Sequence, residues 1–439
     1  MAAEADWLAG SHVFVLSNAG KPVFSTAGGE ADLSSLSALI GALISFARGP
    51  SGADELQSVE GGGRRVVFVV REPLYLVAVT DAREPAARAA RCLHYVHLSI
   101  VRILTGSIEK VLARDATYDL RALLGGTDRA LRGMVEHARS RPDVMLDAVP
   151  CVPLPSATRA EFGRLLLLVQ SECAVLFAVL CAHGMLVSAA SPRRRPLSAP
   201  DLILLLSMLR TSPSLRASAD ESWVPVCLPG FAPSAFLHAH VSTLDGASDL
   251  TLLLLTHSAD GFEHLKAARL ALGQRLSGPT LHALRAAVAP DAREVDASSL
   301  GIRTLRHFLF LDRAASAHVC ARFPRSTPGL ATGSGGADAD ADTDTDTDTD
   351  ARDEASSLLD GYAVLRGELH GSTASLSVLF VADGRRALLG QSGREHELYT
   401  AHDPLCSKAE AGAAAQQLLR WLQRERGMLL LEKQLAWPG

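Results

Sequence analysis

The stretch His12-Val13-Phe14-Val15-Leu16-Ser17-Asn18-Ala19-Gly20-Lys21-Pro22-Val23-Phe24-Ser25 decides the fold of this chain. Its first six residues favour an extended strand, the next five have the composition of a tight turn, and the last three resume the strand. With Asp32 or Ser34 as its cap, a helix is predicted to follow, because apolar residues recur three and four positions apart. The residues expected on its one buried face are Leu36, Leu39, Ile40, Leu43 and Ile44.

The residues up to position 112 complete one structural unit. A Gly61-Gly62-Gly63 turn separates a short strand at residues 56–60 from a valine-rich strand at 64–70, and another strand follows at 75–80. From residue 84 to 112 the apolar positions have a helical period, and a further helix is predicted over 118–137. The order of two strands, helix, three strands and helix predicts a longin domain, which is a five-stranded antiparallel sheet between helices.

This order of elements recurs twice along the chain. Within residues 143–292 it runs from a hairpin around His183-Gly184 through a helix capped by Ser198 to three strands and a helix. The third copy has the weakest sequence pattern and ends with a helix predicted at 408–424. We therefore predict an α+β protein of three longin-like domains at residues 1–142, 143–292 and 293–439, a recurrence of element order and not of residues.

Residues 329–357 are reduced mostly to glycine, alanine, threonine, serine and aspartate, including the run Ala337-Asp338 to Thr349-Asp350. Such a composition cannot bury enough apolar area to offset the entropy of ordering, so we predict a disordered acidic loop inside the third unit. A calcium-binding loop is rejected, because no glycine follows the third acidic position and no glutamate closes a twelve-residue loop.

The composition excludes several classes of protein. The chain has 439 residues, 48% of them hydrophobic and 21% charged, and a net charge of -5, which gives no general attraction to nucleic acid. Residues 1–10 resemble neither a secretory signal nor a presequence, and the longest apolar run, Cys173 to Ala182, is too short to span a bilayer. The seven cysteines lack paired spacing and are expected to be buried thiols in a reducing compartment.

No motif for covalent chemistry is present. Gly20-Lys21-Pro22 lacks the earlier glycine and the following Ser or Thr of a phosphate loop. His238 and His240 lie on one face of a predicted strand and could share a metal, but without a third ligand they are better explained as residues that line a sheet. We therefore expect no enzyme active site, no metal and no cofactor.

Two other features can be explained in two ways. Trp223-Val224-Pro225-Val226-Cys227-Leu228-Pro229 contains two prolines, so it should form an edge strand, and Trp223 either packs on its own sheet or anchors a partner. Arg193-Arg194-Arg195 is either a solvated loop or a contact for anionic lipid.

Several blocks of sequence resemble one known family. On these blocks the chain resembles the MON-one (monensin sensitivity) vacuolar fusion proteins, from residue 11 to about 311 with gaps, and again near the C-terminus. The blocks are Ser11 to Ser25, Val66 to Val79, Tyr118 to Gly126, Trp223 to Phe231, Phe236 to Val241 and Leu418 to Leu422. Family members commonly carry a long polar N-terminal extension, whereas residues 1–10 precede the first strand here, which questions any recruitment through such an extension.

The resemblance implies a protein of three longin domains that pairs with a three-longin subunit of the CCZ type. Together they would be the guanine-nucleotide exchange factor of a late-endosomal (Rab-seven-type) GTPase in endosome conversion and vacuolar fusion. An early-endosomal (Rab-five-type) GTPase and a phosphoinositide-containing membrane would recruit the complex from the cytoplasm to endosomal and vacuolar or lysosomal membranes. The alternative is a longin adaptor or tether that binds partners without promoting exchange.

We assign three candidate surfaces from the residues. The partner and GTPase surface is predicted at the first turn and helix, namely Lys21, Leu36, Leu39, Ile40 and Leu43. The recruiting GTPase is predicted to bind the edge strand, namely Trp223, Val224 and Val226. The candidate lipid contact is Arg193, Arg194 and Arg195.

Overall fold

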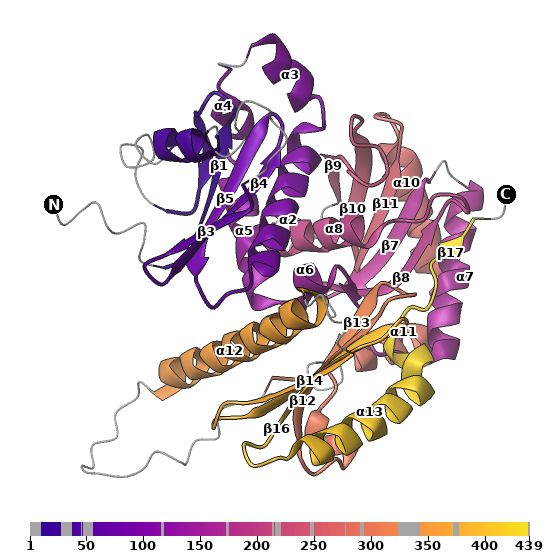
Figure 1. Cartoon of the computed structure of the whole chain (residues 1–439). Helices are drawn as coiled ribbons and strands as arrows, with labels where there is room; N and C mark the ends of the chain where they lie inside the picture. The colour runs from indigo at the N-terminus through magenta and orange to yellow at the C-terminus, as the bar shows by residue number, and fades with distance from the viewer. Residues whose placement is uncertain are drawn as a thin grey trace.

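The computed structural model describes residues 10–27, 37–44, 46, 56–115, 118–172, 175–212, 215, 221–245, 250–276, 278–289, 294–323, 343–371 and 377–437. Within these ranges the chain forms three sheets of five, six and six strands, each covered by helices (Figure 1). Each unit follows the predicted order of two strands, a helix and three further strands, and the five strands of that order lie in its sheet. The predicted fold class, three longin domains of α+β structure, is confirmed.

The first sheet has the strand order β2-β1-β5-β4-β3 and is antiparallel throughout. Its two faces are covered differently, because successive side chains of β1 point to opposite sides. Val13 and Val15 pack in the core that includes α2, whereas Phe14 and Leu16 pack against the helix over residues 37–44. The strands are β1 (His12–Ser17), β2 (Pro22–Ser25), β3 (Ser58–Gly61), β4 (Arg64–Arg71) and β5 (Leu74–Asp81).

Two helices that the sequence predicts as continuous are each divided. The predicted helix at 84–112 consists of α2 (Ala86–Leu104) and α3 (Ile108–Arg114), separated at Thr105, whose φ of 62° is left-handed. The predicted helix at 118–137 consists of α4 (Leu120–Leu124) and α5 (Asp128–Ser140), separated at Gly126 with φ 81°. The helical period continued across both breaks, so periodicity alone could not reveal them.

The second unit begins with α7 and forms its hairpin at His183-Gly184, where both residues have positive φ values of 49° and 73°. Ser198 caps the next helix by accepting a hydrogen bond from Asp201 N, as predicted. The elements are α7 (Ser156–Glu172), β7 (Phe177–Ala182), β8 (Met185–Ser191), α8 (Ala199–Thr211), β9 (Ser222–Val226), β10 (Leu237–Asp245), β11 (Leu250–Thr256), α10 (Phe262–Arg275) and α11 (Gly278–Ala287).

The third unit contradicts the prediction of a loop over residues 329–357, because α12 already begins at Thr343. Residues 324–342 lie outside the described part of the chain. Two effects explain why the acidic run joins the helix. Buried Leu358 and Tyr362 anchor the C-terminal part of α12, and extending an existing helix toward its N-terminus costs little free energy. Aspartate side chains also interact favourably with the N-terminal end of a helix. The elements are η2 (Ala297–Leu300), β12 (Leu305–Asp312), β13 (Ala317–Cys320), α12 (Thr343–Gly371), β14 (Val378–Ala382), β15 (Ala387–Ser392), β16 (His396–His402) and α13 (Lys408–Leu429).

The second and third sheets each gain a sixth strand from a distant part of the chain. β6 (Val149–Pro150) precedes the second unit but pairs in parallel with β13 of the third sheet. β17 (Leu435–Ala436) follows the third unit but pairs in parallel with β8 of the second sheet. These two short strands interlock the units. The domain boundaries after residues 142 and 292 stay predictions; the first falls inside α6 (Pro142–Leu146) and the second outside the described residues.

The corresponding edge of the first sheet is closed by arginines. Arg121 Nε donates to the carbonyl of Pro22 at 2.8 Å, and Arg132 Nη2 donates to the carbonyl of Ser25 at 2.7 Å. These carbonyls belong to β2, the edge strand that corresponds to β8 and β13. Because side chains satisfy these two acceptors, the edge is protected without a sixth strand.

Most of the described cysteines are buried thiols, as the sequence predicts. The six cysteines that the structure describes are free thiols, five of them buried, and Cys173 lies outside the described residues. In the described part of the chain, no helix combines the length and apolar character that a bilayer crossing needs.

Candidate functional site

The helix over residues 37–44 presents an apolar surface to solvent. Leu39, Leu43 and Phe46 are 52%, 37% and 87% exposed, and we call these three residues the apolar helix surface. Ile40 and Ile44 are buried against the first sheet. The prediction that Leu39 and Leu43 belong to one buried face is therefore wrong.

The prediction failed because the apolar face that it assumed is wider than the part of the helix that contacts the sheet. Each residue turns a helix by about 100°, so positions 40 and 44 lie over the sheet while 39, 43 and 46 form the neighbouring stripe. Of the other residues predicted for this surface, Leu36 lies outside the described residues, and Lys21 is exposed in the β1–β2 turn, where Lys21 N donates to Ser17 Oγ at 3.2 Å.

The strand β9 lies at the edge of the second sheet, as predicted from the two prolines of this segment, of which Pro225 lies within the strand. Trp223 is half-buried and stacks on His238 of β10, with ring centroids 5.4 Å apart, and it meets Phe262 of α10 edge-on at 5.8 Å. Trp223 thus packs on its own sheet. Val224 is half-buried, whereas Val226 is completely buried and can offer a partner only its backbone.

The two histidines of β10 contact side chains of their own unit. His240 is fully buried, its Nε2 lies 3.3 Å from Glu221 Oε2, and burial lowers its pKa. His238 is stacked under Trp223. Among the residues that the structure describes, no three His, Cys, Asp or Glu side chains are grouped so that they could hold a metal ion.

The three arginines at 193–195 form an exposed loop between β8 and α8. The guanidinium of Arg195 lies over the ring of Phe231, 5.7 Å from its centroid, in a cation–π contact. The other two side chains are exposed to solvent. The loop therefore offers positive charge on the surface of the second unit.

A buried carboxylate, Asp143, lies where the three units meet, and sequence reasoning missed it. Its Oδ2 is 2.9 Å from His137 Nε2 of α5, and its Oδ1 is 3.0 Å from His318 Nε2 of β13. Arg210 Nη2 of α8 lies 3.6 Å from Oδ2 and Arg141 Nε lies 3.8 Å from it, so each unit contributes at least one partner. Burial raises the pKa of Asp143, but the charge and hydrogen bonds of its partners, His137 first, outweigh burial and hold that pKa well below its usual value.

A second buried ion joins the connecting segment to the C-terminal helix. Arg159 of α7 is 7% exposed and donates to the carbonyls of Val152 and Val187, each at 2.7 Å. It also donates to the carbonyl of Met428 in α13 at 2.9 Å. A guanidinium that satisfies three backbone acceptors fixes the position of three segments at once.

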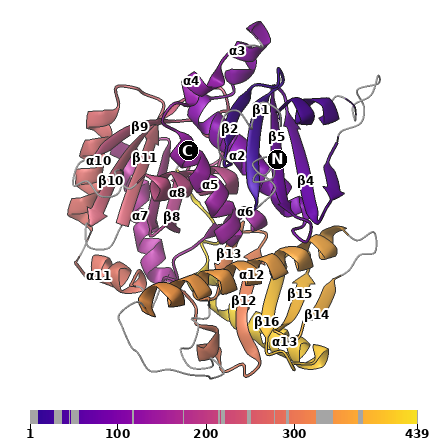
Figure 2. The same cartoon turned by 90° about the vertical axis from the view of Figure 1, so that its left-hand side faces the viewer.

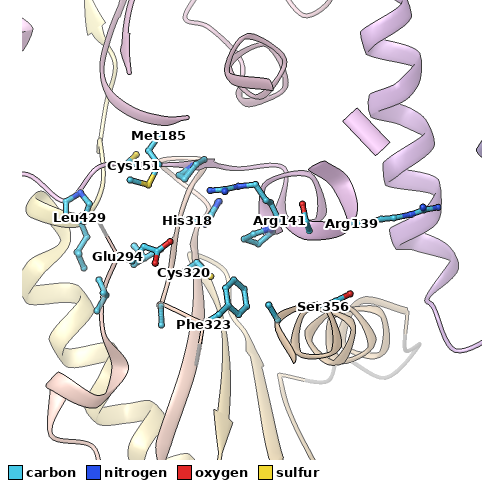
Figure 3. A pocket seen from close by; sticks show the side chains of 18 of the residues that line it. Arg139, Arg141, Cys151, Met185, Glu294, His318, Cys320, Phe323, Ser356 and Leu429 are labelled. Carbon is cyan, nitrogen blue, oxygen red and sulfur yellow. The ribbon is translucent and has the colours of Figure 1, made fainter. Parts of the chain in front are cut away.

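A cavity of about 800 Å³ opens beside the Asp143 junction. Figure 3 shows Arg141 and His318 on one side of it and Ser356 of α12 across from them. Cys320 lines the cavity, and burial raises its pKa to about 12, so its thiol stays protonated and unreactive at neutral pH. The described lining therefore holds no activated cysteine nucleophile.

The arrangement defines a class of protein: three longin units locked together, with exposed apolar and edge-strand surfaces. Models of the first, second and third longin domains of FUZ, MON1 and HPS1 match residues 11–133, 173–271 and 304–426. Vacuolar fusion protein MON1 homolog A of Homo sapiens is 32% identical over 438 residues, which cover 99% of this chain and 63% of that protein.

Further relatives agree. MON1 homolog A of Bos taurus is 32% identical over 97% of this chain and 72% of its own length. The MON1 homolog of Arabidopsis thaliana is 38% identical over 60% of this chain and 42% of its own length. The chain therefore belongs to the MON1 family of vacuolar fusion proteins, and it spans less than two thirds of the human relative. The resemblance read from the sequence blocks is confirmed.

Proposed function

We propose that this chain is one subunit of a heterodimeric guanine-nucleotide exchange factor for a late-endosomal, Rab-seven-type GTPase. Its partner would be a three-longin subunit of the CCZ type. The complex would act in early-to-late endosome conversion and in fusion with the vacuole or lysosome. Family membership supports a role in vacuolar trafficking, and the exposed apolar helix surface is the observation that carries the proposal.

Nucleotide exchange needs binding energy and no covalent chemistry. If the GTPase holds its nucleotide with picomolar affinity, weakening that affinity a thousandfold requires about 4 kcal/mol of differential contact with the two states of the GTPase. Fully burying a leucine or phenylalanine contributes roughly 1.5–3 kcal/mol. Leu39, Leu43 and Phe46 are already partly covered, so the apolar area that they still expose supplies energy of this order only where it contacts the nucleotide-free GTPase more than the nucleotide-bound one.

We further propose that the edge strand β9 binds a recruiting, early-endosomal Rab GTPase and that the loop at 193–195 contacts phosphoinositide-containing membrane. An edge strand offers unpaired backbone groups to a partner, and the exposed arginines offer positive charge to anionic headgroups. These contacts would recruit the protein from the cytoplasm to endosomal and vacuolar membranes.

The decisive experiment measures release of a fluorescent guanine nucleotide from the late-endosomal Rab. We expect release to accelerate at least a hundredfold with this chain plus the CCZ-type subunit, and to stay at the intrinsic rate with an early-endosomal Rab as substrate. Stable binding of the Rab without faster release would support a longin adaptor or tether instead.

A further inference from the structure

The strand β14 (Val378–Ala382) has the sequence of a central strand but lies at the edge of its sheet. Val-Leu-Phe-Val-Ala carries apolar residues on both faces, as strands buried on both sides do. Phe380 packs against the core that includes Leu418 of α13, and Leu379 against the core that includes Leu365 of α12. Figure 2 shows β14 as the outermost strand beside β15.

The backbone of β14 has one paired and one open side. Ser392 N donates to the carbonyl of Ser377, and Asp383 N donates to the carbonyl of Arg386, so residues 377 and 383 point their backbone groups toward β15. Because the direction alternates along an antiparallel ladder, the N–H and C=O groups of Val378, Phe380 and Ala382 point outward. In the described part of the chain, the third sheet has no strand beyond β14 to pair with them.

The side chains of this edge are also open. Val378 is 41% exposed and Val381 is 44% exposed, and they lie on opposite faces of the strand. The edge thus combines outward backbone groups with apolar side chains above and below.

The other sheet edges of this molecule carry protective features that β14 lacks. The strand β3 contains Glu60, which pairs with Arg65 at 2.6 Å, and β9 contains Pro225. Carbonyls of β2 are satisfied by two arginines, while β8 and β13 each receive a short strand. A bare, apolar edge without charge or proline is a template for another strand.

We propose that β14 is the docking edge for an extended, proline-free, mainly apolar segment of the second longin subunit. This inference rests on the proposed heterodimer and names the contact within it. We infer that the occupant is a strand, because an extended segment presents N–H and C=O groups in the alternation that matches the outward groups of β14, and it must be apolar on both faces to cover Val378 and Val381. The chain already uses this mode twice, since β6 and β17 are short segments added to sheet edges.

Hydrogen exchange of the full chain, alone and in complex with the CCZ-type subunit, tests the proposal. We expect the outward amides of Val378, Phe380 and Ala382 to exchange at least tenfold more slowly in the complex. A complex that forms while exchange over residues 377–383 stays unchanged would overturn the docking edge and leave the heterodimer intact. Absence of any complex in light scattering would overturn both.

Substitutions give an independent measurement. Val381→Lys should weaken the complex at least tenfold in titration calorimetry, whereas Val59→Lys, on the corresponding edge strand of the first sheet and 42% exposed, should change the affinity less than twofold. Ala382→Pro should act like Val381→Lys, because it removes an outward N–H and spares the bonds to β15. Wild-type affinity in a folded Val381→Lys protein would contradict the proposal. Concentration-dependent dimers of this chain alone, with slowed exchange at β14, would assign the edge to a second copy and contradict it too.

Discussion

His318 Nε2 lies 3.0 Å from Asp143 Oδ1, although 175 residues separate them in the chain. The same carboxylate meets His137 and Arg210, so one buried charge connects α5 of the first unit, α8 of the second and β13 of the third. If this carboxylate loses its charge, the buried His137 and His318 lose a charge-assisted partner and Arg210 loses an ion pair, so the junction between the three units is weakened.

Asp143→Asn should lower the stability of the whole chain by about 3 kcal/mol at neutral pH, because breaking a buried ion pair strands its partners. The readout is urea unfolding followed by circular dichroism. The matched control is Asp128→Asn, which removes an exposed i,i+4 pair with Arg132 and should cost less than about 0.5 kcal/mol. Equal effects of the two substitutions would contradict the role of Asp143.

Stability should fall on mild acidification because of buried neutral histidines. His307 is fully buried and hydrogen-bonded to Tyr362, and burial lowers its pKa to about 3. Between about pH 6.5 and 3 the unfolded chain binds a proton that the folded chain does not, so stability is lost as the pH falls. His307 alone should contribute about 1.6 kcal/mol of this loss between pH 6.5 and 5.

His307→Phe removes this group, so its stability should vary less steeply over that range than that of the wild type, whatever its absolute value. The measurement is the slope of unfolding free energy against pH. His282→Phe, at an exposed position of α11, is the matched substitution, and the slope should be lower in His307→Phe than in His282→Phe. An unaltered slope in His307→Phe would show that this histidine titrates alike in both states.

Leu43→Glu, on the apolar helix surface, should reduce nucleotide release from the late-endosomal Rab at least tenfold, because a charge there opposes burial against the GTPase or partner. Leu270→Glu on α10, which is 47% exposed, is the matched control and should keep wild-type activity. Full exchange activity in a folded Leu43→Glu complex would remove this helix from the functional surface.

If the Rab binds at β9 as proposed, Trp223→Ala should weaken binding of an early-endosomal Rab at least tenfold, because it removes the half-buried aromatic side chain beside the open edge of that strand. Calorimetry with the GTP-loaded Rab measures the affinity. Tyr118→Ala, which removes another aromatic residue that is 37% exposed, should bind normally. Wild-type affinity in Trp223→Ala would leave the stacking on His238 as the function of this side chain.

Replacing Arg193, Arg194 and Arg195 by alanine should reduce binding to phosphoinositide vesicles about a hundredfold, since each basic residue near an anionic surface contributes about 1 kcal/mol. Co-sedimentation at low and at high salt measures it, and the difference from wild type should shrink as salt rises. Binding to neutral vesicles is the control. Equal binding of both proteins to anionic vesicles would identify the loop as merely solvated.

Much of the fold follows from local sequence. The apolar, β-branched run of β1, the turn at Lys21, the cap at Ser198 and Pro225 of β9 are signals that act over a few residues, and each has the expected structural result. The order of strands and helices, repeated three times, predicted three longin units, because a given order of elements allows few arrangements that bury the apolar faces of its sheet and helices.

Tertiary structure alone decided which apolar residues are covered and which distant segments meet. Helical spacing could not separate buried Ile40 from exposed Leu39, since that depends on where the sheet lies under the helix. The sequence around Asp143 does not predict its contact with His318. The sequences of residues 149–150 and 435–436 likewise do not predict which sheet each segment joins. Local sequence fixes backbone preference over a few residues, whereas contacts between segments hundreds of residues apart depend on how the finished units pack.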